Sequence, residues 1–240
     1  MRNGELLADT QFTQTVLSAG IGKLERNLLK QRATDVLREH LINGRIHPGS
    51  KLIERELAEV LGVSRMPVHD ALVQLEKEGL IVNQAGARTV IELGERDIRE
   101  LYEVRLTLER LAVELAARAA TERDVETLTA SMEAMRSAAE RHDSPAYIEQ
   151  DVAMHRLIWQ QCGNRALRRT LEGMIGPVFM FVAINAHHFD WGEALRLHEE
   201  LVRCIAARDA ASAGTSIERH LDAALQRSLE ASRASALRRE

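Results

Sequence analysis

The stretch Leu57-Ala58-Glu59-Val60-Leu61-Gly62-Val63-Ser64-Arg65 decides the fold of the first part of this 240-residue chain. Its apolar residues before Gly62 recur at helical spacing, and a glycine in that place lets the chain leave a helix in a tight turn. Ser64 is a good N-cap for a second helix, which we expect over residues 65–78. The stretch therefore predicts two helices joined by a short turn, with Val63 filling the gap between them.

The flanking segments complete a recognisable order of elements. A helix is expected over residues 24–43, and β-type triplets at 80–82 and 89–91 flank a loop that contains Gly86, which predicts a hairpin. Helix, helix, turn, helix and hairpin is the order of a winged helix-turn-helix, a DNA-binding fold, over residues 23–93. In that fold the face of the second helix that carries Arg65 and His69 is free to enter a major groove, and Ser64 can donate to a phosphate.

Composition limits the classes of protein to consider. Aromatic residues make up only 3% of the chain and the net charge is −4, so the composition favours helices and any DNA contact must be a local patch. Residues 1–22 show no firm period, and we expect a loosely held arm. The longest apolar run, over residues 174–184, is too short to span a bilayer, and no targeting segment is evident. We therefore expect a cytoplasmic protein with no membrane partner.

The pattern of the chain changes after Leu93-Gly94. From residue 95 onward it is helical, with breaks expected near residues 121, 143–145, 163–164, 176–177, 190–192 and 209. Short connections between helices favour an antiparallel bundle. The expected fold is thus mainly α, with the winged helix-turn-helix followed by an antiparallel bundle of six or seven helices over residues 95–232 and a tail over residues 233–240.

Polar residues on apolar helix stripes mark a candidate site in the bundle. Asp151 and His155 lie one helical turn apart on one face, and His198 and His220 lie on the apolar stripes of two later helices. One carboxylate and three imidazoles suit a divalent Zn, Ni, Mn or Fe ion with open positions for water or a bound acid. The alternative is a set of separate core histidines, each bonded to backbone or to one another. On the residues alone, the two alternatives stay open.

Two further residues are candidates for binding an acid. Arg105 lies on an apolar stripe, where a buried guanidinium needs a carboxylate, either from a ligand or from Glu109 one turn on. Asn185 ends an apolar region, where it either donates to a ligand or caps the helix.

Two parts of the sequence resemble known families. The segments Glu54-Arg55-Glu56-Leu57-Ala58 and Val63-Ser64-Arg65-Met66-Pro67-Val68 are close to the signature of the GntR family of regulators. This resemblance implies that Arg55 and Arg65 contact DNA and that the wing around Gly86 approaches the minor groove. The family usually carries Arg where this chain has His69, which puts that contact in doubt.

The second resemblance concerns the bundle. The bundle resembles the FCD effector domain of the FadR subfamily, because its motif agrees in residue type, spacing and order with Asp151, His155, His198 and His220. This resemblance implies a metal bound through these four positions and a small carboxylate effector beside the metal, which Arg105 contacts. It also implies that operator DNA is released when the acid binds.

We therefore expect a DNA-binding transcription regulator, acting as a repressor. Because one recognition helix reads only a few base pairs, we expect a homodimer on double-stranded operator DNA. Two alternatives remain at this stage. One is a metal-dependent enzyme that acts on a small organic acid and carries a fused DNA-binding module, although only Glu109 offers a spare inward carboxylate. The other is a purely structural metal with constitutive DNA binding.

Overall fold

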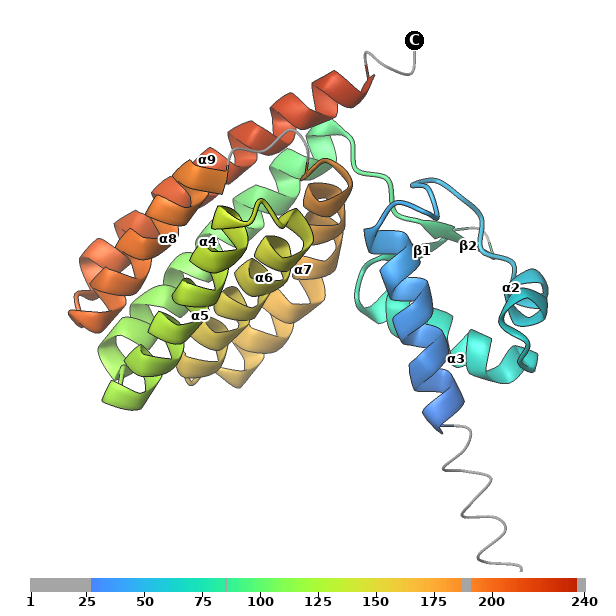
Figure 1. Cartoon of the computed structure of the whole chain (residues 1–240), viewed down its shortest axis with the longest axis horizontal. Helices are drawn as coiled ribbons and strands as arrows, with labels where there is room; N and C mark the ends of the chain where they lie inside the picture. Colours follow the sequence, from blue (N-terminus) through green and yellow to red (C-terminus); the bar gives the residue numbers. More distant parts are fainter. Residues whose placement is uncertain (1–26, 85, 187–190, 237–240) are drawn as a thin grey trace, which may run out of the picture.

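The computed structural model describes residues 27–84, 86–186 and 191–236. They form a small N-terminal domain and a larger helical domain, which lie side by side (Figure 1). The arm expected over residues 1–22 lies outside the described residues, and so does the end of the tail expected over residues 233–240. The expected fold class, a winged helix-turn-helix followed by a helical bundle, is confirmed.

The N-terminal domain has the predicted order of elements. A helix covers residues 27–42 and is followed by α2 (Glu54–Leu61), α3 (Arg65–Lys77), β1 (Ile81–Gln84) and β2 (Ala87–Val90). Gly62 ends α2 at φ +64°, the left-handed conformation that glycine adopts without strain. The core of this domain is built from residues that share helical or strand spacing and are fully buried, among them Leu41, Leu72, Leu75 and Ile81.

The hairpin is tighter than the sequence predicts. β1 and β2 are antiparallel with Ile81 opposite Val90 and Gln84 opposite Ala87, so only two residues separate the strands instead of the expected six-residue loop. Gly86 has a φ of +81°, which suits a two-residue hairpin turn and lets pairing continue to Gln84. Four residues that were expected to lie in the loop are therefore strand residues and lengthen the wing: Asn83, Gln84, Ala87 and Arg88.

The larger domain is a bundle of six helices among the described residues. They are α4 (Glu95–Ala119), α5 (Glu122–Glu140), α6 (Ser144–Gln161), α7 (Arg165–Ile184), α8 (Trp191–Ala206) and α9 (Ala210–Ala236). Thr121, Asp143 and Asn164 cap α5, α6 and α7, since each side chain accepts a hydrogen bond from a backbone N–H of the first turn. Four of the expected breaks therefore lie where helices end: near 121, at 143–145, at 163–164 and near 209.

The break expected at Gly176-Pro177 is wrong, because α7 runs through it without interruption. Pro177 has no N–H, so the carbonyl of Gly173 loses its usual partner within the helix. The oxygen of this carbonyl lies near the N-terminal domain, 3.4 Å from the position that a Cβ on Gly79 would take. Burial of the surrounding apolar residues, including Ile175 and Val178, holds the helix together across the proline.

The two domains meet at α7, which lies on the side of the bundle that faces the N-terminal domain (Figure 1). Met180 of α7 is buried among the core residues of the N-terminal domain, and Ile184 packs against the same core. The remaining core of the bundle forms a second, separate hydrophobic cluster that includes Trp159, Tyr147 and Leu171. One helix of the bundle therefore contributes to both cores.

Candidate metal centre and nucleic-acid interface

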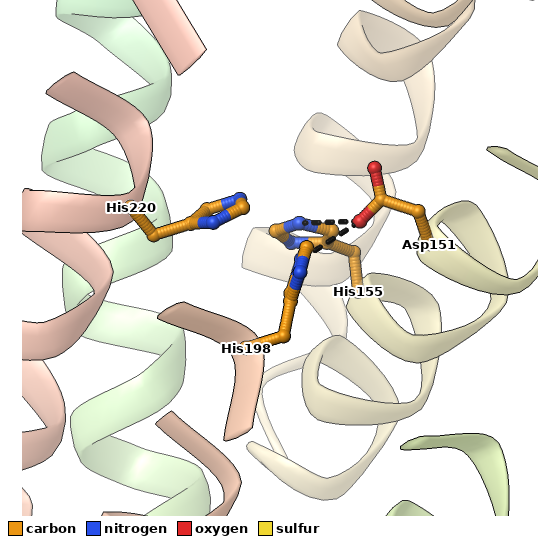
Figure 2. A group of neighbouring side chains, drawn as sticks. All are labelled: Asp151, His155, His198 and His220. Carbon is orange, nitrogen blue, oxygen red and sulfur yellow. Dashed lines mark ion pairs between the residues drawn. The ribbon is translucent and has the colours of Figure 1, made fainter. Parts of the chain in front are cut away.

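The four predicted metal ligands converge in the middle of the bundle. Asp151 and His155 come from α6, His198 from α8 and His220 from α9, and their side chains point toward one another (Figure 2). One ligand atom from each side chain lies within 4.8 Å of the others. The three imidazoles are buried, and Asp151 is partly buried. Because His220 follows Asp151 by 69 residues, only the packing of three helices brings the four residues together.

Two of the imidazoles are held from behind in one orientation. His155 Nδ1 lies 2.7 Å from Glu109 Oε2, and His198 Nδ1 lies 2.9 Å from the carbonyl oxygen of Ala194. Since both partners are acceptors, each Nδ1 carries the proton and donates it. Each Nε2 is then left to face the centre, which is the arrangement that metal-binding histidines adopt.

The inner atoms of the group lack hydrogen bonds. Asp151 Oδ1 lies 2.8 Å from His198 Nε2 and 3.5 Å from His155 Nε2. Asp151 Oδ1 and His198 Nε2 are nevertheless buried without a hydrogen-bond partner, as is His220 Nδ1. Buried polar atoms are costly without a partner. A shared cation would satisfy Asp151 Oδ1 and His198 Nε2 at once, and each of the four side chains offers a ligand atom, so the residues fit a divalent metal.

The charges around the centre favour ionised acids and a neutral His220. Burial raises the pKa of Asp151, but His198 and His155 outweigh burial and lower it. The pKa of His220 is lowered well below its usual value, first by burial and then by the neighbouring His198 and His155. A carboxylate and a neutral imidazole are the forms that coordinate a metal.

Glu109 of α4 is the residue that the sequence reasoning left without a settled role. It is fully buried, and its Oε1 accepts from Arg105 Nη2 at 2.6 Å and from Arg105 Nε at 3.0 Å. Its Oε2 accepts from His155 and from Trp159 Nε1. Burial raises the pKa of Glu109, but His155 and Arg105 outweigh it and bring the pKa to about 2. Both oxygens are therefore already paired and the group is ionised.

A cavity of about 40 Å³ adjoins the centre. Arg105 lines it, and so do three residues that the sequence analysis did not select as ligands: Tyr102, Tyr147 and Arg227. The hydroxyl of Tyr147 is buried without a hydrogen-bond partner, and Arg227 pairs with Glu193 at 3.2 Å. Helical spacing could have identified Tyr147 and Arg227 as neighbours of the metal ligands. Tyr147 precedes Asp151 by one turn, and Arg227 follows His220 by two turns on the same face.

Asn185 lies apart from this group. It caps the end of α7, and its Nδ2 donates to the carbonyl oxygen of Phe181 at 2.9 Å. It is not among the residues that line the cavity beside the metal ligands. The structure thus brings Arg105 to the centre and places Asn185 at a helix end.

The predicted DNA-contact residues lie on the outer surface of the N-terminal domain. Arg65 is 70% exposed on α3, and His69 is exposed one turn further along the same helix. Arg55 is exposed on α2 and makes no ion pair with the described part of the chain. Ser64 is the N-cap of α3 but its side chain makes no capping hydrogen bond, so its hydroxyl is free to donate to a phosphate.

Glu54 ties the recognition helix to the wing. Its carboxylate lies 2.7 Å from His69 Nδ1, 3.8 Å from Arg65 Nη2 and 2.6 Å from Arg88 Nη1. Arg88, on strand β2 beside Gly86, was not selected from the sequence. The Glu54 carboxylate therefore contacts Arg65 and His69 of the recognition helix and Arg88 of the wing at the same time.

The fold and the two sites define a class of protein, a DNA-binding regulator with a separate helical ligand domain. The profile of the bacterial regulatory proteins of the gntR family matches residues 29–91, and that of the FCD domain matches residues 100–223. The chain belongs to the GntR family and carries an FCD domain. The predicted membership is thereby confirmed, and so is the expectation that the protein is a transcription regulator rather than an enzyme.

Individual relatives agree with this assignment. The HTH-type transcriptional regulator McbR of Escherichia coli (strain K12) is 32% identical over 170 residues, which cover 70% of this chain and 75% of McbR. The gluconate operon transcriptional repressor of Bacillus licheniformis is 30% identical over 72% of this chain and 74% of its own length. The solved structure of E. coli McbR/YncC superposes with a TM-score of 0.70 at 25% identity, covering 84% of this chain and 97% of that one. Within the described residues, no helix is both long and apolar enough to cross a bilayer.

Proposed function

We propose that the protein is a repressor whose affinity for operator DNA is set by a small carboxylate bound beside a metal ion in the FCD domain. The observation that carries this proposal is the group of Asp151, His155, His198 and His220. Their inner atoms converge within 4.8 Å, and three of these atoms are buried without a hydrogen bond. Buried polar atoms without a partner are costly, and a bound cation would provide that partner.

The donor set suits ions that accept imidazole and carboxylate together, such as Zn, Ni, Mn or Fe in the divalent state. When bound, the metal supplies an open coordination position for an anion. On the protein side, Arg105 and Arg227 bring positive charge to the cavity, and the Tyr147 hydroxyl is free to donate. The cavity of about 40 Å³ has room for only a few water-sized groups, which favours a small acid.

The structure changes the expected role of Arg105. Two of its donors are already used by Glu109, so the alternative of an internal pair is realised. We infer that Arg105 acts on the acid mainly through its charge and that Arg227, which is less buried, makes the direct contact. The enzyme alternative had only Glu109 as a spare inward carboxylate, and both oxygens of Glu109 are already paired.

Negative control of transcription is supported by what two relatives are called. They are named as the gluconate operon transcriptional repressor and the probable D-xylose utilization operon transcriptional repressor. We propose that this protein is a repressor too, and that acid binding at the proposed metal centre releases the operator, in the cytoplasm where the DNA lies.

We further propose a homodimer held by the outer face of α4. This face carries Leu101, Val104, Leu108, Leu111 and Leu115, whose spacing of three and four residues alternates as in a coiled-coil seam. Val104 and Leu111 remain 48% and 44% exposed, while the other three are partly buried against the bundle. A second copy of the chain covers this seam with the same seam of its own, as a two-fold axis requires.

Elemental analysis of purified protein tests the centre. The wild type should contain one divalent metal per chain, and His198→Ala should lose most of it. His40→Ala is a matched control, because His40 Nδ1 also bonds a carbonyl four residues back, that of Val36, but lies outside the group. Equal metal content in the two variants would refute the site. If metal is present and a screen of small carboxylates leaves operator binding unchanged, the ion is structural and DNA binding is constitutive.

A further inference from the structure

We propose that residues 176–182 of α7 form the mechanical link between the metal centre and the recognition helix α3. This inference rests on the proposed function, because it concerns how occupancy of the centre reaches the DNA-binding domain. It is carried by contacts that this one stretch of helix makes on its two sides.

On one side, the stretch forms a wall of the metal centre. Val178, Phe179 and Val182 line the cavity beside the ligands. The Phe179 ring packs edge-on against the ring of His155, with 6.4 Å between centroids. Any change in the position of the His155 imidazole therefore meets α7 directly, since packed cores transmit displacement rather than absorb it.

On the other side, the same stretch touches the end of the recognition helix. Glu78 is the C-cap of α3, and a Cβ atom added to Gly176 would overlap the carbonyl oxygen of Glu78. A Cβ on Gly79 would come within 3.0 Å of Pro177 Cγ. The glycines let the two backbones meet, and there is no room for even a methyl group between Gly176 and α3.

The contact is held from within the N-terminal domain as well. The carboxylate of Glu78 accepts two hydrogen bonds from Arg38, at 2.8 and 2.9 Å. Arg38 belongs to the helix over residues 27–42, so a displacement at Glu78 is shared by two helices of that domain. Met180, one residue past Phe179, is buried in the same domain's core.

The helix can also bend at this place. Pro177 leaves the carbonyl of Gly173 without its intrahelical hydrogen bond, and a helix bends most readily at such a point. A cavity of about 600 Å³ lies between the domains and shares Phe179 with the smaller cavity at the metal centre. An ion or acid bound at the metal centre shifts α3 only if it binds more tightly to one position of residues 176–182 than to another.

The test is hydrogen–deuterium exchange on the full-length protein, stripped with EDTA and then loaded with Zn²⁺. Zn²⁺ should slow exchange several-fold around the ligands, over residues 176–184 and over residues 74–80 at the end of α3. Gly176→Ala should bind Zn²⁺ as the wild type does and lose only the response over residues 74–80. Gly173→Ala is the matched control, because it lies in the same helix and a Cβ there meets nothing within 4 Å. It should respond as the wild type does.

A second variant guards against misfolding of Gly176→Ala. Pro177→Ala supplies the missing N–H to the Gly173 carbonyl and removes the ring that packs on Gly79, and it too should weaken the response over residues 74–80. A Zn²⁺ response in the wild type that stops within the FCD domain would overturn the inference, as would an undiminished response in both variants. Wild-type protein that takes up no Zn²⁺, Ni²⁺, Mn²⁺ or Fe²⁺ would instead refute the proposed function, and with it any link from the centre.

Discussion

At the scale of single residues, Glu109 connects His155 and Arg105, which the sequence assigned separately to metal binding and to acid binding. It orients His155, a proposed metal ligand, with one oxygen and neutralises Arg105 with the other. A carboxylate behind a metal-bound histidine fixes both its tautomer and its direction.

Glu109→Gln should therefore lower metal affinity by about 10- to 100-fold while leaving the four ligands in place. It should also destabilise the domain by about 3–5 kcal/mol, because Arg105 is left as a buried charge without its partner. Metal titration and chemical unfolding measure the two effects. Glu114→Gln is the control, since Glu114 on the same helix also pairs with arginines but on the surface. Metal affinity that is equal in both variants would contradict the role of Glu109.

Arg65 tests the nucleic-acid interface at the same scale. Arg65→Ala should weaken operator binding by about 1–3 kcal/mol if the guanidinium reads a guanine edge. Arg45→Ala is a close control, because Arg45 is also exposed and also lies 3.8 Å from one glutamate, but it is outside α3. Gel-shift titration with an operator selected from random duplexes gives the comparison. A loss of affinity that is no larger for Arg65→Ala than for Arg45→Ala would refute the assignment.

At the scale of elements, the turn between α2 and α3 depends on the backbone of Gly62. Its φ is +64° and a Cβ there would meet no atom within 4 Å, so a substitution introduces backbone strain without a clash. Gly62→Ala should destabilise the N-terminal domain by about 1 kcal/mol. Gly62→Asn should cost less, because asparagine tolerates the left-handed region. Thermal unfolding measures both, and an alanine variant as stable as the wild type would show that the turn relaxes.

At the scale of the whole molecule, the seam on α4 predicts the state of assembly. Val104→Lys places a charge in the seam and should convert the dimer to a monomer, because a buried unpaired lysine is costly. Val60→Lys makes the same substitution at a residue that is 83% exposed on α2, and it should leave the dimer intact. Sedimentation velocity distinguishes the two. A wild type that sediments as a monomer, or a Val104→Lys variant that remains dimeric, would rule out this seam.

The sequence by itself determined the order of the elements, the class of fold and the four candidate ligands. The signals for these are local. Caps such as Thr121, Asp143 and Asn164 act over one helical turn, and the pair Asp151 and His155 shares a helix face through its spacing alone. Such features depend on a few neighbouring residues and are readable without knowing how the helices pack.

Only the tertiary structure decided which groups stand behind the ligands and where the domains touch. Glu109 and His155 are 46 residues apart, and no spacing rule connects them. The choice of Glu109 as the partner of Arg105 and the continuity of α7 through Pro177 depend on burial that neighbouring helices provide. The contact of Gly176 with Glu78 joins two domains. Contacts between distant segments follow from the relative placement of helices, which the local pattern of residues does not contain.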